Sequence, residues 1–117
     1  MDLLKTALAL SGIPAPSGFE QAAIDAIAET ARAYASDMRR TPAGSLIVRR
    51  PGHGRRILFI THADTLGFLT TYREDGGALR VSPLGPVDVH TALGAPLVST
   101  RGTRGIIGAD FGVKPAE

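Results

Sequence analysis

Residues 57–64, which read ILFITHAD, decide the fold of this chain. The first four are apolar without alternation, a pattern typical of a strand buried on both faces at the centre of a helix-covered sheet. Polar side chains then follow at Thr61, His62 and Asp64. In open α/β sheets, ligands sit beyond the carboxyl ends of the strands. The sequence therefore delivers an imidazole, His62, and a carboxylate, Asp64, to the usual location of a functional site.

The spacing of His62 and Asp64 carries a second indication. Side chains two residues apart in an extended segment point to the same side. We therefore expect the carboxylate to accept a hydrogen bond from the imidazole and to orient it, as carboxylates do beside metal-bound histidines. A lone His-x-Asp also fits a hydrogen-bonded histidine at a strand end with an aspartate that caps a turn. These two residues alone leave both interpretations open.

Two helices are predicted before this strand. Asp2 can cap a helix that runs to about Leu10, and Gly12 can end it. A proline-containing stretch follows, after which Ser17 and Glu20 have the spacing of a capping box. Apolar residues at three- and four-residue steps then predict an amphipathic helix to about residue 34.

Short strands dominate the rest of the chain. They are predicted at residues 38–40, 46–49, 68–73, 78–81, 96–100 and 103–107, with no convincing helix after residue 65. The change of pattern predicts an α/β fold, with a helix-covered sheet in residues 1–66 and the start of a small β-barrel in residues 67–117.

Composition narrows the chemistry. The 117 residues include no cysteine, which excludes disulfides, thiolate metal sites and a cysteine nucleophile. Histidine and carboxylate ligands remain. Apolar residues make up 44% of the chain but never form the run of roughly 18 that a membrane span needs. Asp2 also stands where a signal peptide would carry basic residues. We expect a soluble cytoplasmic protein without a membrane partner.

The net charge of +2 hides an uneven distribution. Between Asp37 and Asp64 there is no acidic residue, and six arginines occupy positions 39, 40, 49, 50, 55 and 56. An anion or nucleic-acid patch would show a steep salt dependence. No aromatic residue lies among the arginines before Phe59, so base stacking has little support. The pattern favours solvated arginines at strand ends, and no nucleic-acid partner is predicted.

Five stretches together resemble the glutamyl-aminopeptidase and tetrahedral-aminopeptidase family of dinuclear metallopeptidases. They are residues 13–20 (IPAPSGFE), 44–47 (GSLI), 62–68 (HADTLGF), 84–88 (LGPVD) and 106–108 (IIG). Their order and spacing make the resemblance more specific than any one of them, and it runs through nearly all of the chain. Thr65 departs from the family pattern, which usually has glutamate at this position.

The resemblance implies roles for the two residues. His62 would be a terminal ligand of one metal in a two-metal site, and Asp64 would be the catalytic-site residue that orients it. The ions would be zinc or cobalt, because imidazole and carboxylate ligands suit both. They would act on the carbonyl of a peptide substrate whose N-terminal amine is held in place. In the family the other ligands and the glutamate base come later in the chain. The acids downstream are not assigned to them; these are Glu74, Asp75, Asp88, Asp110 and Glu117.

The predicted function is therefore the N-terminal portion of a metal-dependent aminopeptidase, inactive alone at this length. In the family the inserted β-barrel helps to assemble homo-oligomers. The alternative is a non-enzymatic, truncated relative that keeps the β part as a self-association or binding module. Sequence beyond residue 117 would separate the two, because an enzyme needs further Asp, Glu and His ligands.

Overall fold

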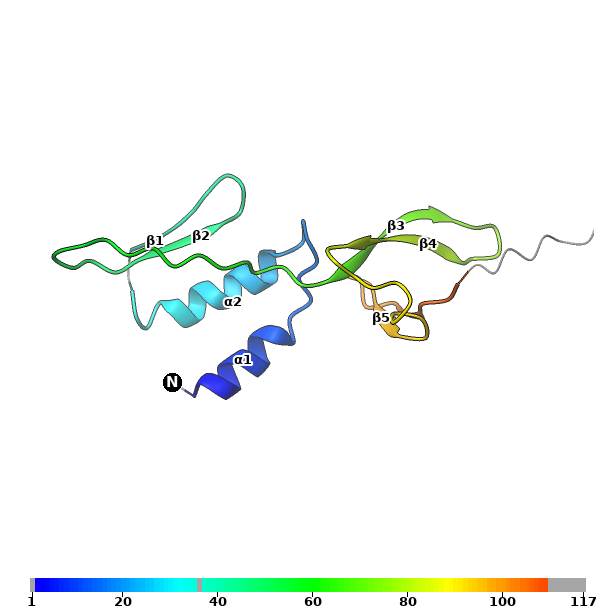
Figure 1. The fold of residues 1–117 in the computed structure, drawn as a ribbon, viewed down its shortest axis with the longest axis horizontal. Helices are drawn as coiled ribbons and strands as arrows, with labels where there is room; N and C mark the ends of the chain where they lie inside the picture. Colours follow the sequence, from blue (N-terminus) through cyan, green and yellow to red (C-terminus); the bar gives the residue numbers. More distant parts are fainter. Residues whose placement is uncertain (1, 36, 110–117) are drawn as a thin grey trace, which may run out of the picture. The chain divides into compact units, whose positions relative to one another are not determined.

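The computed structural model describes residues 2–35 and 37–109 (Figure 1). Within these ranges it contains two helices and six strands, and the strands pair as three antiparallel hairpins. The chain divides into two compact units, residues 1–85 and 86–117. The sequence predicted a domain boundary near residue 66, and that boundary stays a prediction.

Helix α1 spans Leu3–Ser11 and confirms the first predicted helix. The Asp2 side chain accepts a hydrogen bond from the backbone N–H of Lys5 at 3.2 Å, which satisfies one of the free donors of the first turn. At the other end, the N–H of Gly12 donates to the carbonyl of Leu8 at 3.2 Å. Local chemistry thus fixes both ends of this helix.

Helix α2 spans Gln21–Ala31, and its start corrects the predicted capping box. Glu20 occupies the cap position but makes no side-chain capping bond. Its carboxylate instead accepts from the N–H of Gly18 at 2.8 Å, and the Ser17 hydroxyl bonds to a residue far along the chain. The sequence pattern predicted that the Ser17 hydroxyl caps α2, but in the folded chain it donates to a distant residue.

Strands β1 (Asp37–Arg40) and β2 (Leu46–Arg49) form the first hairpin, as predicted. Its turn contains Gly44 with a φ of 86°, a conformation that glycine adopts without strain. Two of the six arginines pair with carboxylates here: Arg40 with Asp25 of α2, and Arg49 with Asp37 across the hairpin. These contacts support the interpretation of the arginines as strand-end residues.

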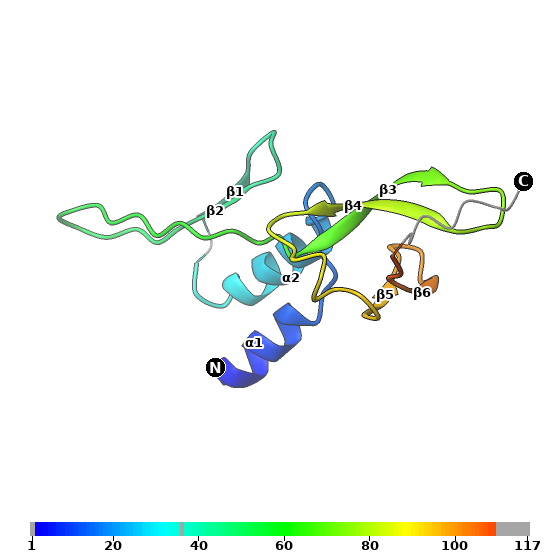
Figure 2. The same ribbon diagram turned by 45° about the vertical axis from the view of Figure 1, so that its right-hand side comes forward.

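The predicted buried strand at residues 57–60 is wrong for the described structure. The segment has no strand partner there, and Figures 1 and 2 draw it as plain coil. Its four apolar side chains are 77–90% exposed. A strand exists only through hydrogen bonds to neighbouring strands, and the described residues provide none for this segment.

Strands β3 (Gly67–Arg73) and β4 (Leu79–Leu84) form the second hairpin and confirm two further predicted strands. The pairing joins Gly67 to Leu84 at one end and Arg73 to Leu79 at the other, with an irregularity between Thr70 and Tyr72. In the second unit, β5 (Pro96–Val98) pairs with β6 (Arg104–Ile106), both of which are visible in Figure 2.

The buried core of the described residues is very small. Ala15 is fully buried, Ala23 is 5% exposed, and no other hydrophobic side chain of the described ranges is classed as buried. None of the described helices is long and apolar enough to span a membrane. Ala15 is the more deeply buried of the two alanines, and the loop that carries it bonds to Asp64 and Thr65.

Candidate metal site

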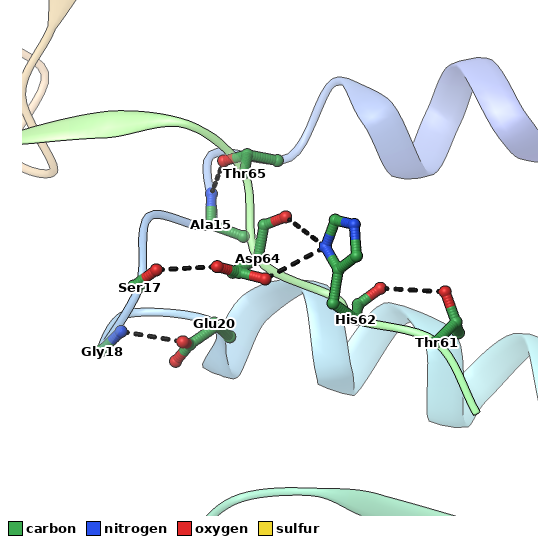
Figure 3. Close-up of polar contacts among 8 residues, drawn as sticks. All are labelled: Ala15, Ser17, Gly18, Glu20, Thr61, His62, Asp64 and Thr65. Atoms are coloured by element: carbon green, nitrogen blue, oxygen red, sulfur yellow. Dashed lines mark hydrogen bonds and ion pairs between the residues drawn. The ribbon is translucent and has the colours of Figure 1, made fainter. Parts of the chain in front are cut away.

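His62 and Asp64 contact each other as the two-residue spacing predicts (Figure 3). Nδ1 of His62 lies 3.0 Å from Oδ1 of Asp64 and 3.1 Å from the backbone oxygen of the same residue. Both oxygens are acceptors, so Nδ1 carries a proton and donates a hydrogen bond to them. In the neutral ring the lone pair is then on Nε2. The imidazole is thereby prepared to bind an electrophile through Nε2.

The second carboxylate oxygen of Asp64 has its own donor. The hydroxyl of Ser17 donates to Oδ2 at 2.7 Å, a contact drawn in Figure 3. This hydrogen bond is the largest of the influences that hold the pKa of the Asp64 carboxyl below its usual range. Partial burial opposes it, while the neighbouring His62 lowers the same pKa further. Asp64 is therefore an anion near neutral pH and can accept from both neighbours.

A short two-stranded contact holds the loop of Ser17 against the segment of Asp64. Pro16 and Thr65 form an isolated parallel bridge. The N–H of Thr65 donates to the carbonyl of Ala15 at 2.7 Å, and the N–H of Ala15 donates to the Thr65 hydroxyl at 3.2 Å. Ala15 is fully buried as a result. The backbone on either side of the site is thus fixed by hydrogen bonds in both directions.

The position of His62 differs from the expected end of an interior strand facing a cleft. Its side chain is 84% exposed, and residues 57–60 before it have no strand partner in the described structure. Two shallow hollows of the described part lie elsewhere, one between α2 and the first hairpin and one between α1 and α2. Neither hollow is lined by His62, so α1, α2 and the first hairpin do not form a cleft around its side chain.

The described residues fit part of a metal site. Residues 2–35 and 37–109 contain no group of three or more His, Cys, Asp or Glu side chains that could hold a metal ion. Asp110 and Glu117 lie outside the described residues. What the described residues offer at this point is an exposed imidazole in contact with a carboxylate.

Sequence reasoning missed the third member of this arrangement, Ser17. Its signal was present in residues 13–20, one of the stretches that carry the family resemblance. We assigned the serine to the cap of α2, since Glu20 follows three residues later. Nothing in that local pattern points to Asp64, which is 47 residues away.

Comparison with known proteins identifies the family. The model of the M42 glutamyl aminopeptidase family matches residues 44–115, more than half of the chain. The chain belongs to the M42 glutamyl aminopeptidase family. This assignment confirms the resemblance seen in the sequence, including the stretch that carries His62 and Asp64.

Several M42 relatives and solved structures are similar to this chain. A protein assigned as an aminopeptidase in Acetivibrio thermocellus is 32% identical over 106 residues, which cover 91% of this chain and 31% of that protein. The Pyrococcus horikoshii TET1 peptidase, which can assemble into a tetrahedron or a large octahedral shell, has a TM-score of 0.78 at 31% identity, covering 92% of this chain and 33% of that one.

A TET aminopeptidase from a marine-sediment archaeon of the Thaumarchaeota has a TM-score of 0.82 at 27% identity. The matched region covers 91% of this chain and 31% of that one. This M42 chain therefore spans about a third of the length of the relatives it matches. The α/β class is confirmed by these likenesses, whereas the β-barrel and the roles of His62 and Asp64 stay predictions.

Proposed function

We propose that this chain forms the N-terminal portion of a metal-dependent aminopeptidase. In this proposal His62 ligates one metal ion, and Asp64 orients the imidazole of His62. The observation that carries the proposal is the contact between Nδ1 of His62 and Oδ1 of Asp64, 3.0 Å long, in a chain of an aminopeptidase family. Metal-bound histidines commonly donate their other N–H to a carboxylate in this way.

The part played by this chain follows from the hydrogen bonds of the imidazole. Because two oxygens of Asp64 accept from Nδ1, the neutral ring carries its proton there and presents Nε2 as the ligand atom. The carboxylate of Asp64 holds the ring in this orientation, as such partners do beside metal-bound histidines. His62 would thus bind a cation without first having to reorient or to lose a proton from Nε2.

The proposed cofactors are two divalent ions, zinc or cobalt, both of which accept imidazole and carboxylate ligands. When bound, such ions polarise a carbonyl and lower the pKa of water. A catalytic zinc takes about three protein ligands, and the described residues contain no group of three or more His, Cys, Asp or Glu side chains that could hold one. We propose that the remaining ligands and a glutamate general base lie outside this chain. The substrate would be a peptide with a free N-terminus.

The β part has a different proposed role. We propose that residues 67–117 begin an inserted β-barrel domain that takes part in homo-oligomer assembly. The described hairpins β3–β4 and β5–β6 are compatible with such a domain. Support also comes from the TET1 peptidase of Pyrococcus horikoshii, which can assemble into a tetrahedron or a large octahedral shell.

A non-enzymatic binding module remains the second candidate. The observation in its favour is that the described residues hold no cluster of metal-binding side chains. The two candidates differ in whether the protein hydrolyses peptides and in whether that activity depends on divalent ions. The enzyme would lose hydrolysis after chelation and regain it with zinc or cobalt, whereas a binding module would show no hydrolysis with or without these ions.

The test is His62→Ala in the protein encoded by the whole reading frame. We expect bound zinc to fall and the hydrolysis of aminoacyl-p-nitroanilides to drop by more than about 100-fold, since loss of a ligand exceeds the loss of an orienting partner. His53→Ala is the matched control, because His53 is an exposed histidine in a turn after β2. Zinc content and hydrolysis that stay at wild-type values in His62→Ala would disprove the proposed role.

A further inference from the structure

Among residues 2–35 and 37–109, Ser17 is the side chain whose hydrogen bond joins the N-terminal loop to the proposed metal-binding pair. We propose that Ser17 is a positioning residue: its hydroxyl fixes the Asp64 carboxylate and, through it, the imidazole of His62. This inference rests on the proposed function of His62 and adds a residue to it.

The first argument is how the two carboxylate oxygens are divided. Oδ2 of Asp64 accepts the Ser17 hydroxyl at 2.7 Å, and Oδ1 faces Nδ1 of His62 at 3.0 Å (Figure 3). An ionised carboxylate only accepts, so the hydroxyl must donate. A carboxylate held by one oxygen can rotate about its last side-chain bond, because that torsion is broad. A donor on the second oxygen removes this freedom and sets the plane in which the imidazole is held.

The second argument is that the donor itself is fixed. Ser17 follows the Ala15–Pro16 backbone, which is bridged to Thr65 by hydrogen bonds in both directions. Thr65 in turn follows Asp64. Donor and acceptor are therefore carried by two backbone segments that pair beside them, and Ala15 in the first of these segments is fully buried. The backbone positions of donor and acceptor are thus fixed relative to each other, and the hydrogen bond needs only one side-chain rotamer of Ser17.

The third argument separates this role from that of a helix cap. The cap position of α2 is Glu20, and it makes no side-chain capping bond. The hydroxyl of Ser17 donates to Asp64, and the N–H of Gly18 is served by Glu20. Removing the hydroxyl thus deprives α2 of no capping bond. Its direct effect falls on Asp64.

The experiment uses the protein encoded by the whole reading frame, with zinc affinity measured by competition with a chromophoric chelator. We expect Ser17→Ala to bind zinc about 10- to 100-fold more weakly, the range typical of partners that orient metal ligands. Ser17→Thr keeps a hydroxyl and should restore most of the affinity. Ser11→Ala is the control, since the Ser11 hydroxyl makes an exposed bond to the carbonyl of Leu8 at the end of α1.

A double-mutant cycle identifies the path of the effect. If Ser17 acts through Asp64, Ser17→Ala should weaken zinc binding little further once Asp64→Ala is present. Equal losses with and without Asp64 would overturn the inference, as would wild-type affinity in Ser17→Ala. His62→Ala in the same series tests the proposed function separately. If only His62→Ala weakens binding, the positioning role fails while the ligand role stands. If His62→Ala has no effect, both fail.

Discussion

Gly67 passes the ring of Pro16 so closely that a Cβ atom on Gly67 would lie 2.8 Å from the Cβ of Pro16. Carbon atoms without a bond between them do not approach to this distance. Glycine at position 67 therefore lets the start of β3 lie against the loop that carries Ser17. The approach belongs to the same contact as the bridge between Pro16 and Thr65.

Gly67→Ala should push these two segments apart. We expect a loss of about 1–3 kcal/mol in the free energy of unfolding, as for other overpacked contacts, together with weaker zinc binding. Thermal unfolding followed by circular dichroism would measure the first effect. Gly76→Ala is the matched control, because a Cβ there would meet no atom within 4 Å. Equal stability of the two variants would contradict the close approach.

Asp64→Asn should impair the proposed enzyme less than His62→Ala. The amide retains an oxygen that can accept from Nδ1, but it lacks the charge that strengthens the imidazole as a ligand. We expect kcat/KM to fall about 10- to 100-fold. Steady-state kinetics with saturating zinc would measure it. A loss as large as that of His62→Ala would mean that Asp64 does more than orient the ring.

The contact between α2 and the first hairpin should depend on pH through Asp25. Hydrogen bonds from Gln21 and then from Arg40 hold the pKa of the Asp25 carboxyl below its usual value of 3.8. A lowered pKa means that the contribution to stability is fully present above the usual value and is lost as the pH falls through the lower one. The thermal midpoints of the wild type and Asp25→Asn should therefore converge below about pH 3.8.

Arg40→Ala serves as the control for this titration. It removes the guanidinium partner and should raise the pKa of Asp25 in the folded chain, so that the two midpoints have fully converged at a higher pH than with Arg40 in place. The effect should be small, since the ion pair is on the surface. A difference between wild type and Asp25→Asn that stays constant from pH 7 to acid would contradict the role of Asp25.

The 117-residue chain on its own should self-associate. Residues 57–60 expose four apolar side chains on an extended segment without a strand partner in the described structure, and such edges pair with other chains. Light scattering as a function of concentration would measure this. Phe59→Lys should reduce the association, because the Phe59 side chain is 90% exposed.

Leu3→Lys provides the comparison, since Leu3 is 72% exposed but lies on α1. If both substitutions reduced association equally, general hydrophobic contact would account for it. A monodisperse monomer of the wild-type chain at about 100 μM would contradict the prediction, since aggregation-prone surfaces already act at micromolar to millimolar concentrations.

The features that could be predicted from the sequence are local. Asp2 and Gly12 mark the ends of α1 through backbone groups within four residues. The hairpins follow from alternating strands around short turns such as the one at Gly44. The contact between His62 and Asp64 follows from a spacing of two residues. Each of these depends on neighbours in the chain, which a sequence states directly.

The features that were missed depend on distant partners. The hydroxyl of Ser17 could serve the start of α2 or Asp64, and only the folded chain decides between them. Residues 57–60 have the composition of a buried strand, but burial requires strands and helices that the described residues do not supply. The apolar composition of a segment indicates that it favours burial, but whether it is buried depends on the strands and helices that pack against it.

The separation of 47 residues between Ser17 and Asp64 also has a consequence for biosynthesis. At about 5–20 residues per second, a ribosome adds Asp64 roughly 2–10 s after Ser17. Helix α2 and both strands of the first hairpin lie between these two residues in the sequence. All of them are synthesised before the Ser17 hydroxyl can have its carboxylate partner. The hydrogen bond from Ser17 to Asp64, which supports the imidazole of His62, therefore forms after these elements have been synthesised.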